Sequence, residues 1–201
     1  MKRASYSNSI ANFRAASQNE ILGALSQGSE LADEPTQKAA WLEEAIILKE
    51  VLSHFEGRIY FEYSIPRMGK YIDVVLLIGP VIFVLEFKVG EKHFTLSALD
   101  QVCDYALDLK NFHDSSYNHF IAPVLIPTEA RHVTPVVCAT PQGDKLLSPI
   151  RCSVALLGEV IEAVLRSAEG DKDIDPEVWE SGRYCPTPTI IEAALALYKK
   201  H

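Results

Sequence analysis

The sequence predicts a mixed α/β (α+β) fold in which a central mixed sheet of four to five strands is flanked by helices. Two observations support this class. Runs of β-branched and aromatic residues recur between residues 58 and 139. Stretches with helical spacing of apolar residues precede and follow them. The 201 residues, of which 48% are hydrophobic and 23% charged, suffice for one ample core with extensions at its ends.

Two helical segments are expected before the first strand. Residues 8–26 show loose helical periodicity that ends near Gly28, so residues 1–35 are predicted to form an N-terminal helical appendage. A stronger helix is expected from Thr36 to Phe55. Glu44 falls on the apolar stripe of this helix, where it either reaches solvent at the margin or is buried for a functional reason.

The most informative segment is a predicted hairpin. After a first strand at Arg58–Ile65 and a turn, two apolar runs at 71–78 and 81–89 surround the breaker dipeptide Gly79-Pro80. If this dipeptide is the two-residue loop, paired residues keep a constant sum of residue numbers. Asp73 then lies directly opposite Glu86.

Two carboxylates at opposed positions repel each other, so the pair needs an explanation. Lys88 lies two residues beyond Glu86 on the same face. One reading is a buried salt bridge between Lys88 and one acid, which leaves the other acid unpaired at a cost. The reading that we favour is a divalent metal site formed by Asp73 and Glu86.

A helix is expected after the hairpin. Ser97 followed by Asp100 predicts a capping box that begins a helix running to about Phe112. Gln101 and Tyr105 lie one turn apart on it, on a stripe adjacent to the apolar one. The alternative for both residues is a packed helix face whose polar ends are wet.

The remaining segments predict further strands and helices. Strands are expected at 120–126 and 133–139, where Pro123 and Pro135 favour bulges or sheet edges. Helices are expected at 154–167, 176–180 and 189–200. We assign residues 36–140 to the core and 141–201 to a C-terminal helical extension. Because His201 follows no capping signal, we expect the extension to lead into a further domain.

Composition limits the classes of function. No secretory signal is visible, and the richest apolar run is too short to span a bilayer, so the prediction is a cytoplasmic protein without membrane contact. Four scattered cysteines without a Cys-x-x-Cys pair argue against a zinc site or a disulfide framework. The net charge of -8 counts against a simple electrostatic grip on nucleic acid. A metal would supply local positive charge, and Arg67, Lys70 and Lys92 lie nearby in sequence, although they are equally well explained as solvated strand ends.

The order helix, three strands, helix, strand, with Asp73 on the second strand and Glu86-Phe87-Lys88 on the third, resembles the PD-(D/E)XK nuclease superfamily over residues 36–140. Gln101 and Tyr105 resemble the Gln-x-x-x-Tyr motif of its RecB-like branch, and Glu44 matches an acid often found on the first helix. Segments 63–73, 84–90 and 101–113 are similar to the N-terminal region of bacterial Schlafen-like, superfamily 1 type helicase proteins. Because the chain contains no P-loop motif, an ATPase or helicase is expected only as a partner domain.

The resemblance implies a restriction-endonuclease-like core and metal-dependent hydrolysis of phosphodiester bonds in DNA or RNA. Asp73, Glu86 and the Phe87 carbonyl would hold Mg²⁺ or Mn²⁺, with Glu44 bound through water or helping to hold a second ion. Lys88 would orient or deprotonate the attacking water.

Gln101 and Tyr105 are implied to position Lys88 or a backbone phosphate by hydrogen bonds. Two other functions stay open at this point. One is a catalytically silent module of the same fold that binds or docks nucleic acid. The other is a protein-interaction domain whose acids only tune stability.

Overall fold

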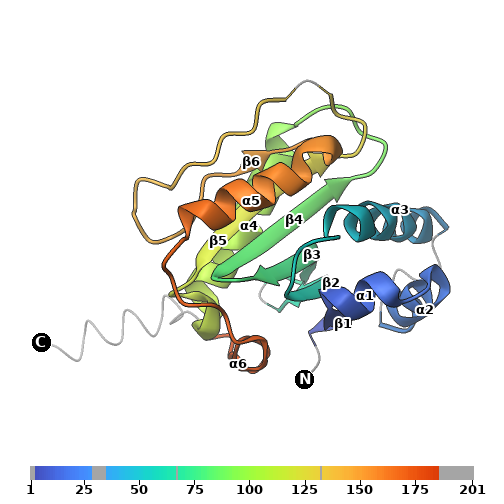
Figure 1. Cartoon of the computed structure of the whole chain (residues 1–201), viewed down its shortest axis with the longest axis horizontal. Helices are drawn as coiled ribbons and strands as arrows, with labels where there is room; N and C mark the ends of the chain where they lie inside the picture. The colour runs from blue at the N-terminus through green and yellow to red at the C-terminus, as the bar shows by residue number, and fades with distance from the viewer. Residues whose placement is uncertain (1–2, 29–34, 67, 132, 186–201) are drawn as a thin grey trace, which may run out of the picture.

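The computed structural model describes residues 3–28, 35–66, 68–131 and 133–185, and the account below concerns these residues. Its elements follow one another along the chain as β1 (Ala4–Ser9), α1 (Ile10–Ala15), α2 (Gln18–Gly28), α3 (Pro35–Val51), β2 (Arg58–Ile65), β3 (Lys70–Ile78), β4 (Val81–Lys88), α4 (Leu96–Phe112), η1 (Asp114–Ser116), β5 (Phe120–Pro127), β6 (Ile150–Arg151), η2 (Val154–Leu156), α5 (Leu157–Ser167) and α6 (Pro176–Glu180). The mixed α/β class is confirmed (Figure 1).

The strands form one sheet in the order β1-β2-β3-β4-β5-β6. The first four are antiparallel neighbours, whereas β5 and β6 run parallel to β4. Helix α4 makes the crossover that a parallel β4-β5 pair requires. The sheet therefore has six strands, and the expected count of four to five is wrong.

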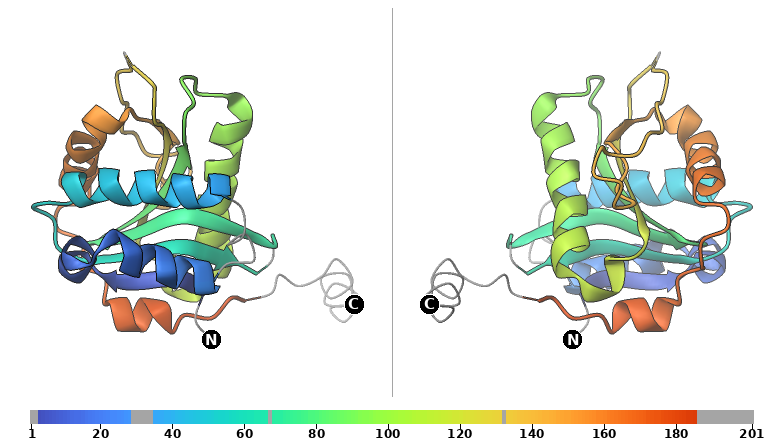
Figure 2. Two further views of the ribbon diagram at one scale, coloured as in Figure 1. Left: turned by 90° about the vertical axis from the view of Figure 1, so that its right-hand side faces the viewer. Right: turned by 90° about the vertical axis from the view of Figure 1, so that its left-hand side faces the viewer.

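Two opposite faces of this sheet are buried (Figures 1 and 2). Apolar residues of α1, α2, α3 and α5 pack on one face, which we call the α3 face. Residues of α4 and α6 pack on the other, the α4 face. Strand β4 is buried on both faces from Val81 to Phe87. Any ionised group in the middle of this sheet is thus far from bulk water.

The hairpin of β3 and β4 has the predicted register. Ile78 pairs with Val81, and the ladder continues to Val74 opposite Leu85. Gly79 adopts a φ of 54°, the positive value needed at the first loop position of a type II′ turn, and Pro80 supplies the negative φ at the second. The turn chemistry therefore fixes which residues of the two strands face each other.

The expectation of a purely helical N-terminal segment is wrong. Ala4–Ser9 forms strand β1, paired with β2, and the Ser9 side chain then caps α1 by accepting from the Asn12 N–H. Only Ala4 and Tyr6 of β1 are buried, and its other side chains are serines and an asparagine with weak strand preference. Pairing with the exposed edge of β2, rather than intrinsic propensity, makes this segment a strand.

The expected strand at 133–139 is also absent from the described part of this segment. Its one ladder contact is an isolated bridge from Ala139 to Leu147, and the sixth strand is instead the short β6. Pro135 has no N–H to contribute to a ladder. Pro123 lies inside β5, paired with Val84 of β4. On the other side of β5 the register shifts by one residue between the Ile121–Leu146 bridge and the Val124–Ile150 pair, so a bulge of the kind expected lies beside Pro123.

The helices expected at 154–167 and 176–180 are confirmed as η2 with α5 and as α6. The one expected at 189–200 lies outside the described residues, as does Arg67. In the part of the chain that is described, none of the helices combines the length and the apolar character needed to cross a membrane.

Candidate functional site

Asp73 lies where the ladder between β3 and β4 stops. The last pair is Val74 with Leu85, and Asp73 and Glu86 are the next positions in that register. In a continued ladder Phe87 would face Ile72, but its N–H instead donates to Asp73 Oδ2 at 2.8 Å. An extended residue directs its N–H and C=O toward the same neighbouring strand, so the Phe87 carbonyl also lies on the Asp73 side.

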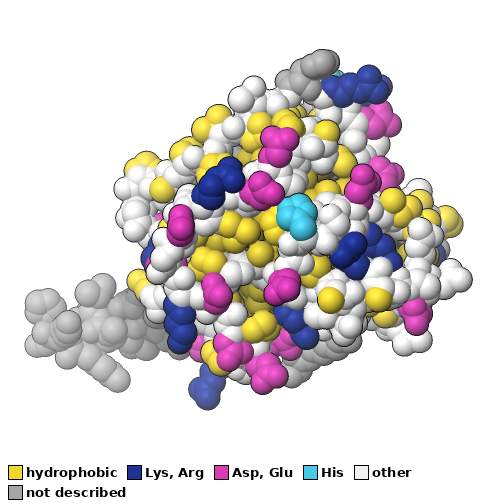
Figure 3. Space-filling view, viewed as in Figure 1, with side chains coloured by type: hydrophobic (Ala, Val, Ile, Leu, Met, Phe, Trp, Pro, Cys, Tyr) yellow, Lys and Arg dark blue, Asp and Glu magenta, His cyan; other side chains and the backbone are white. Residues whose placement is uncertain are grey.

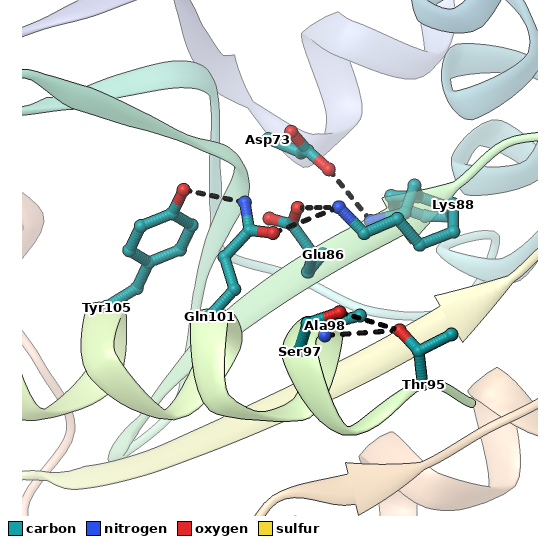
Figure 4. Close-up of polar contacts among 9 residues, drawn as sticks. Asp73, Glu86, Lys88, Thr95, Ser97, Ala98, Gln101 and Tyr105 are labelled. Atoms are coloured by element: carbon teal, nitrogen blue, oxygen red, sulfur yellow. Dashed lines mark hydrogen bonds and ion pairs between the residues drawn. The ribbon is translucent and has the colours of Figure 1, made fainter.

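Glu86 and Lys88 form an ion pair on β4 (Figure 4). Lys88 Nζ lies 2.7 Å from Glu86 Oε1. The Glu86 side chain is 3% exposed, and that of Lys88 is 30% exposed. The Lys88 side chain therefore reaches the buried carboxylate from the solvent side, and the site is open on that side.

Two residues of α4 extend this chain of contacts, as Figure 4 shows. Lys88 Nζ donates to Gln101 Oε1 at 3.1 Å, and Gln101 Nε2 donates to the Tyr105 hydroxyl at 2.8 Å. Gln101 and Tyr105, predicted to lie one turn apart, thus form a continuous chain of hydrogen bonds that begins at Lys88. Burial raises the pKa of Tyr105 to about 12, so its hydroxyl stays protonated near neutral pH.

The start of α4 differs from the prediction. Its N-cap is Thr95, whose side chain accepts from the Ala98 N–H at 3.2 Å, and not Ser97. Ser97 lies within the first turn and contacts the Thr95 hydroxyl at 3.3 Å. The earlier start leaves Gln101 and Tyr105 in position, because both lie well inside the helix.

Glu44 of α3 lies close enough to Asp73 and Glu86 for their charges to act on it, and it is 4% exposed. Its pKa is raised well above the ordinary value, first by burial and then by the charge of Asp73. Among the described residues, nothing donates a hydrogen bond to its Oε2. The marginal, solvent-reaching alternative for Glu44 is therefore wrong.

The Asp73-Glu86 pair has the electrostatics of two acids that cannot both stay ionised. Burial and then the charge of Glu86 raise the pKa of Asp73 well above its ordinary value. The pKa of Glu86 is also raised by burial, with Lys88 acting in the opposite direction.

Glu62 of β2 is a site residue that sequence reasoning missed. In the register of β2 and β3, Phe61 pairs with Val74 and Tyr63 with Ile72, so Glu62 lies across from Asp73. Glu62 is 5% exposed and has a φ of 50°, rare for a residue with a side chain. The three acids thus form one row across β2, β3 and β4. The rule that paired residues keep a constant sum of residue numbers placed Glu86 opposite Asp73. The same rule would have placed Glu62 if the register between β2 and β3 had been known.

The regular alternation of both strands breaks at this row. In β2, Tyr60 and Tyr63 both pack on the α4 face, although they are three residues apart. In β3, Ile72 and Val75 do the same. The sequence does not reveal this break, because it depends on how β2 and β3 pair with each other.

The donor set fits a hard divalent cation only with help from other ligands. Among the described residues, no three His, Cys, Asp or Glu side chains are placed to hold a metal ion. Glu86 Oε2, however, is buried and receives no hydrogen bond from the described residues. A cation here would take oxygens of Asp73 and Glu86, with the Phe87 carbonyl and water completing its shell.

Of the basic residues predicted near the site, Lys70 lies close to the acid pair and Lys92 forms an exposed contact elsewhere. The charge of Lys70 lowers the pKa of Glu86, so this residue lies close enough to act on the acid pair. Lys92 is exposed and faces Glu129 at 3.5 Å. The face in Figure 3 shows acidic and basic side chains interspersed, without one broad basic surface.

No family model matches the chain, and searches of curated proteins and of solved structures also gave no match.

Proposed function

We propose that this chain is a metal-dependent nuclease domain of restriction-endonuclease-like fold that hydrolyses phosphodiester bonds of DNA or RNA. The observation that carries the proposal is the Asp73-Glu86 pair at the end of the β3-β4 ladder. Two acids meet there, one buried oxygen of Glu86 receives no hydrogen bond from the described residues, and a lysine contacts Glu86 from the solvent side. A divalent cation is the simplest group that satisfies all three conditions.

Each acid would have a distinct role. Asp73 is oriented by the Phe87 N–H, which leaves its second oxygen for a ligand. Glu86 would bind through Oε2, and Glu44 would bind through water or help to hold a second ion. A bound Mg²⁺ or Mn²⁺ would supply a polarised water and stabilise charge on the phosphate.

Lys88 would orient the attacking water or the phosphate. Its ammonium is held between Glu86 and Gln101, and the Tyr105 hydroxyl fixes the orientation of the Gln101 amide by accepting from Gln101 Nε2 at 2.8 Å. This arrangement keeps the ammonium near the scissile phosphate without burying it. We also propose, from the sequence resemblance, that the domain works with an ATPase or helicase domain.

A cleavage assay tests this function. The purified chain is mixed with labelled single- and double-stranded DNA and RNA in Mg²⁺ or Mn²⁺. Because both residues act at the reacting phosphate, Glu86→Ala and Lys88→Ala should each lower the rate by about 100-fold or more. The matched control is Lys92→Ala, an exposed lysine four residues away, which should cleave like the wild type. Equal rates in all four proteins would assign the activity to a contaminant.

A second function, a catalytically silent nucleic-acid-binding module, is favoured by one observation. Lys88 Nζ already occupies the space beside Glu86 Oε1, so the lysine serves as an internal cation. In this case nucleic acid should bind with a steep salt dependence that Glu86→Ala leaves unchanged. Calorimetric titration separates the two functions, because only the nuclease predicts Mn²⁺ binding that is lost in Asp73→Asn.

A further inference from the structure

Glu62 lines a cavity at the edge of the sheet, on the side away from α4. The cavity measures about 460 Å³, and residues of β1, the end of α2, β2 and β3 line it. Tyr71 and Ser64 also line it, as do Ser5 and Gln27. Because Glu62 lies across from Asp73 and Tyr71 is two residues from Asp73 on β3, the cavity adjoins the proposed reaction site.

Two side chains of α3 orient the Glu62 carboxylate through one of its oxygens. Trp41 Nε1 donates to Oε1 at 2.7 Å, and Gln37 Nε2 approaches the same oxygen at 3.4 Å. A carboxylate whose only task were to accept from Trp41 would not need a left-handed backbone, which costs on the order of 1 kcal/mol. Such strain is typical of residues that are aimed at a ligand.

Tyr71 supplies the second element of a binding site. Its side chain is exposed, with 41% of its surface accessible, on a strand that is buried from Val74 onward. An exposed aromatic ring beside a cavity is a platform on which a nucleobase stacks. Ser5, Ser64 and Gln27 add hydroxyl and amide groups to the walls, so the cavity offers donors and acceptors around an aromatic edge.

We propose that this cavity binds one unpaired base of a single-stranded nucleic acid next to the cleaved phosphate, with Glu62 accepting from its exocyclic amino group. The proposal rests on the proposed function, because it assigns the substrate of that site. Carboxylates accept from the N4 amino group of cytosine, whereas uracil presents a carbonyl oxygen at this position. The site should therefore favour cytosine over uracil, and single strands over duplexes, whose bases are paired.

Binding in chelator tests the cavity separately from cleavage. Fluorescein-labelled short strands of deoxycytidine and of deoxyuridine are titrated with the chain in EDTA, and anisotropy reports affinity. The deoxycytidine strand should bind about 5- to 150-fold more tightly, the range expected for one specific base contact. Glu62→Gln keeps an acceptor for Trp41 and should fold, yet it should abolish or reverse this preference, because an amide can donate to the uracil carbonyl.

A second variant keeps the test independent of Glu62. Tyr71→Ala should weaken both strands by a similar factor, about 5- to 150-fold, because stacking does not depend on base identity. Equal affinity for the two strands, no binding of either, or a preference that survives in Glu62→Gln would overturn the proposal. Cleavage without base preference would refute the cavity alone, whereas base preference without cleavage in Mn²⁺ would refute the nuclease and keep the cavity.

Discussion

Replacing Glu44 by glutamine should stabilise the metal-free protein at alkaline pH. Glu44 is 4% exposed, its Oε2 receives no hydrogen bond from the described residues, and Asp73 and Glu62 act on it with like charge. A buried ionic group without a partner costs about 1–3 kcal/mol or more. The glutamine amide is neutral and can donate to the acids that repel the native carboxylate. We expect Glu44→Gln to raise the free energy of unfolding at pH 8 by about 1–3 kcal/mol.

The raised pKa of Glu44 determines how the stability of the wild type should change with pH. Since the folded protein raises the pKa of Glu44, the folded state holds a proton that the unfolded chain releases. The stability that this proton provides is complete below the unfolded pKa of about 4.3 and is lost as the pH rises through the folded pKa. The wild type should therefore approach the glutamine variant in stability at pH 5 and fall below it at pH 8.

Urea unfolding in EDTA at pH 5 and pH 8 measures the difference. For a chain of this size, 1 kcal/mol corresponds to roughly 2–4 °C in the midpoint of thermal unfolding, so the two methods check each other. The control is Glu50→Gln, an exposed acid on the same helix, which should change stability by less than about 0.5 kcal/mol. A Glu44→Gln variant that is less stable than the wild type at pH 8, or equally shifted at both pH values, would refute the reasoning.

Three further predictions concern neighbouring contacts. Titration with Mn²⁺ in buffers of different ionisation enthalpy should show proton release, because burial raises the pKa of both Asp73 and Glu86 and a cation must displace the proton that an acid of raised pKa retains. This release should vanish in Asp73→Asn. Trp41→Phe should lower the free energy of unfolding by about 1–3 kcal/mol, since it leaves Glu62 without its 2.7 Å donor, and chemical denaturation measures this. Thr95→Ala should cost about 1 kcal/mol in the same assay, whereas an equal loss in Ser97→Ala would contradict the observed cap.

The hairpin could be predicted from sequence because its information is local. Gly79-Pro80 determines the turn, the turn determines the register, and the register places Asp73 next to Glu86. The spacing of Gln101 and Tyr105 on one helix is local in the same way. These residues account for most of the candidate site on β3, β4 and α4.

The missed features depend on contacts distant in sequence. Strand β1 forms because an open edge of β2 accepts it, and its own residues give little sign of a strand. The role of Glu62 depends on the β2-β3 register and on Trp41 from another element. The segment at 133–139 has the composition of a strand, but the edge beside β5 is taken by residues 150–151. In each case the deciding partner lies far along the chain.

The ion pair of Lys88 with Glu86 has a consequence for the order in which ligands bind. While the ammonium lies 2.7 Å from Oε1, it competes with any cation for the same carboxylate. An arriving phosphate would draw the ammonium outward and release the carboxylate, so substrate would raise the affinity for metal. By linkage, metal would raise the affinity for substrate by the same factor. The lysine would then act as a tethered counterion that keeps an empty site neutral until both ligands are present.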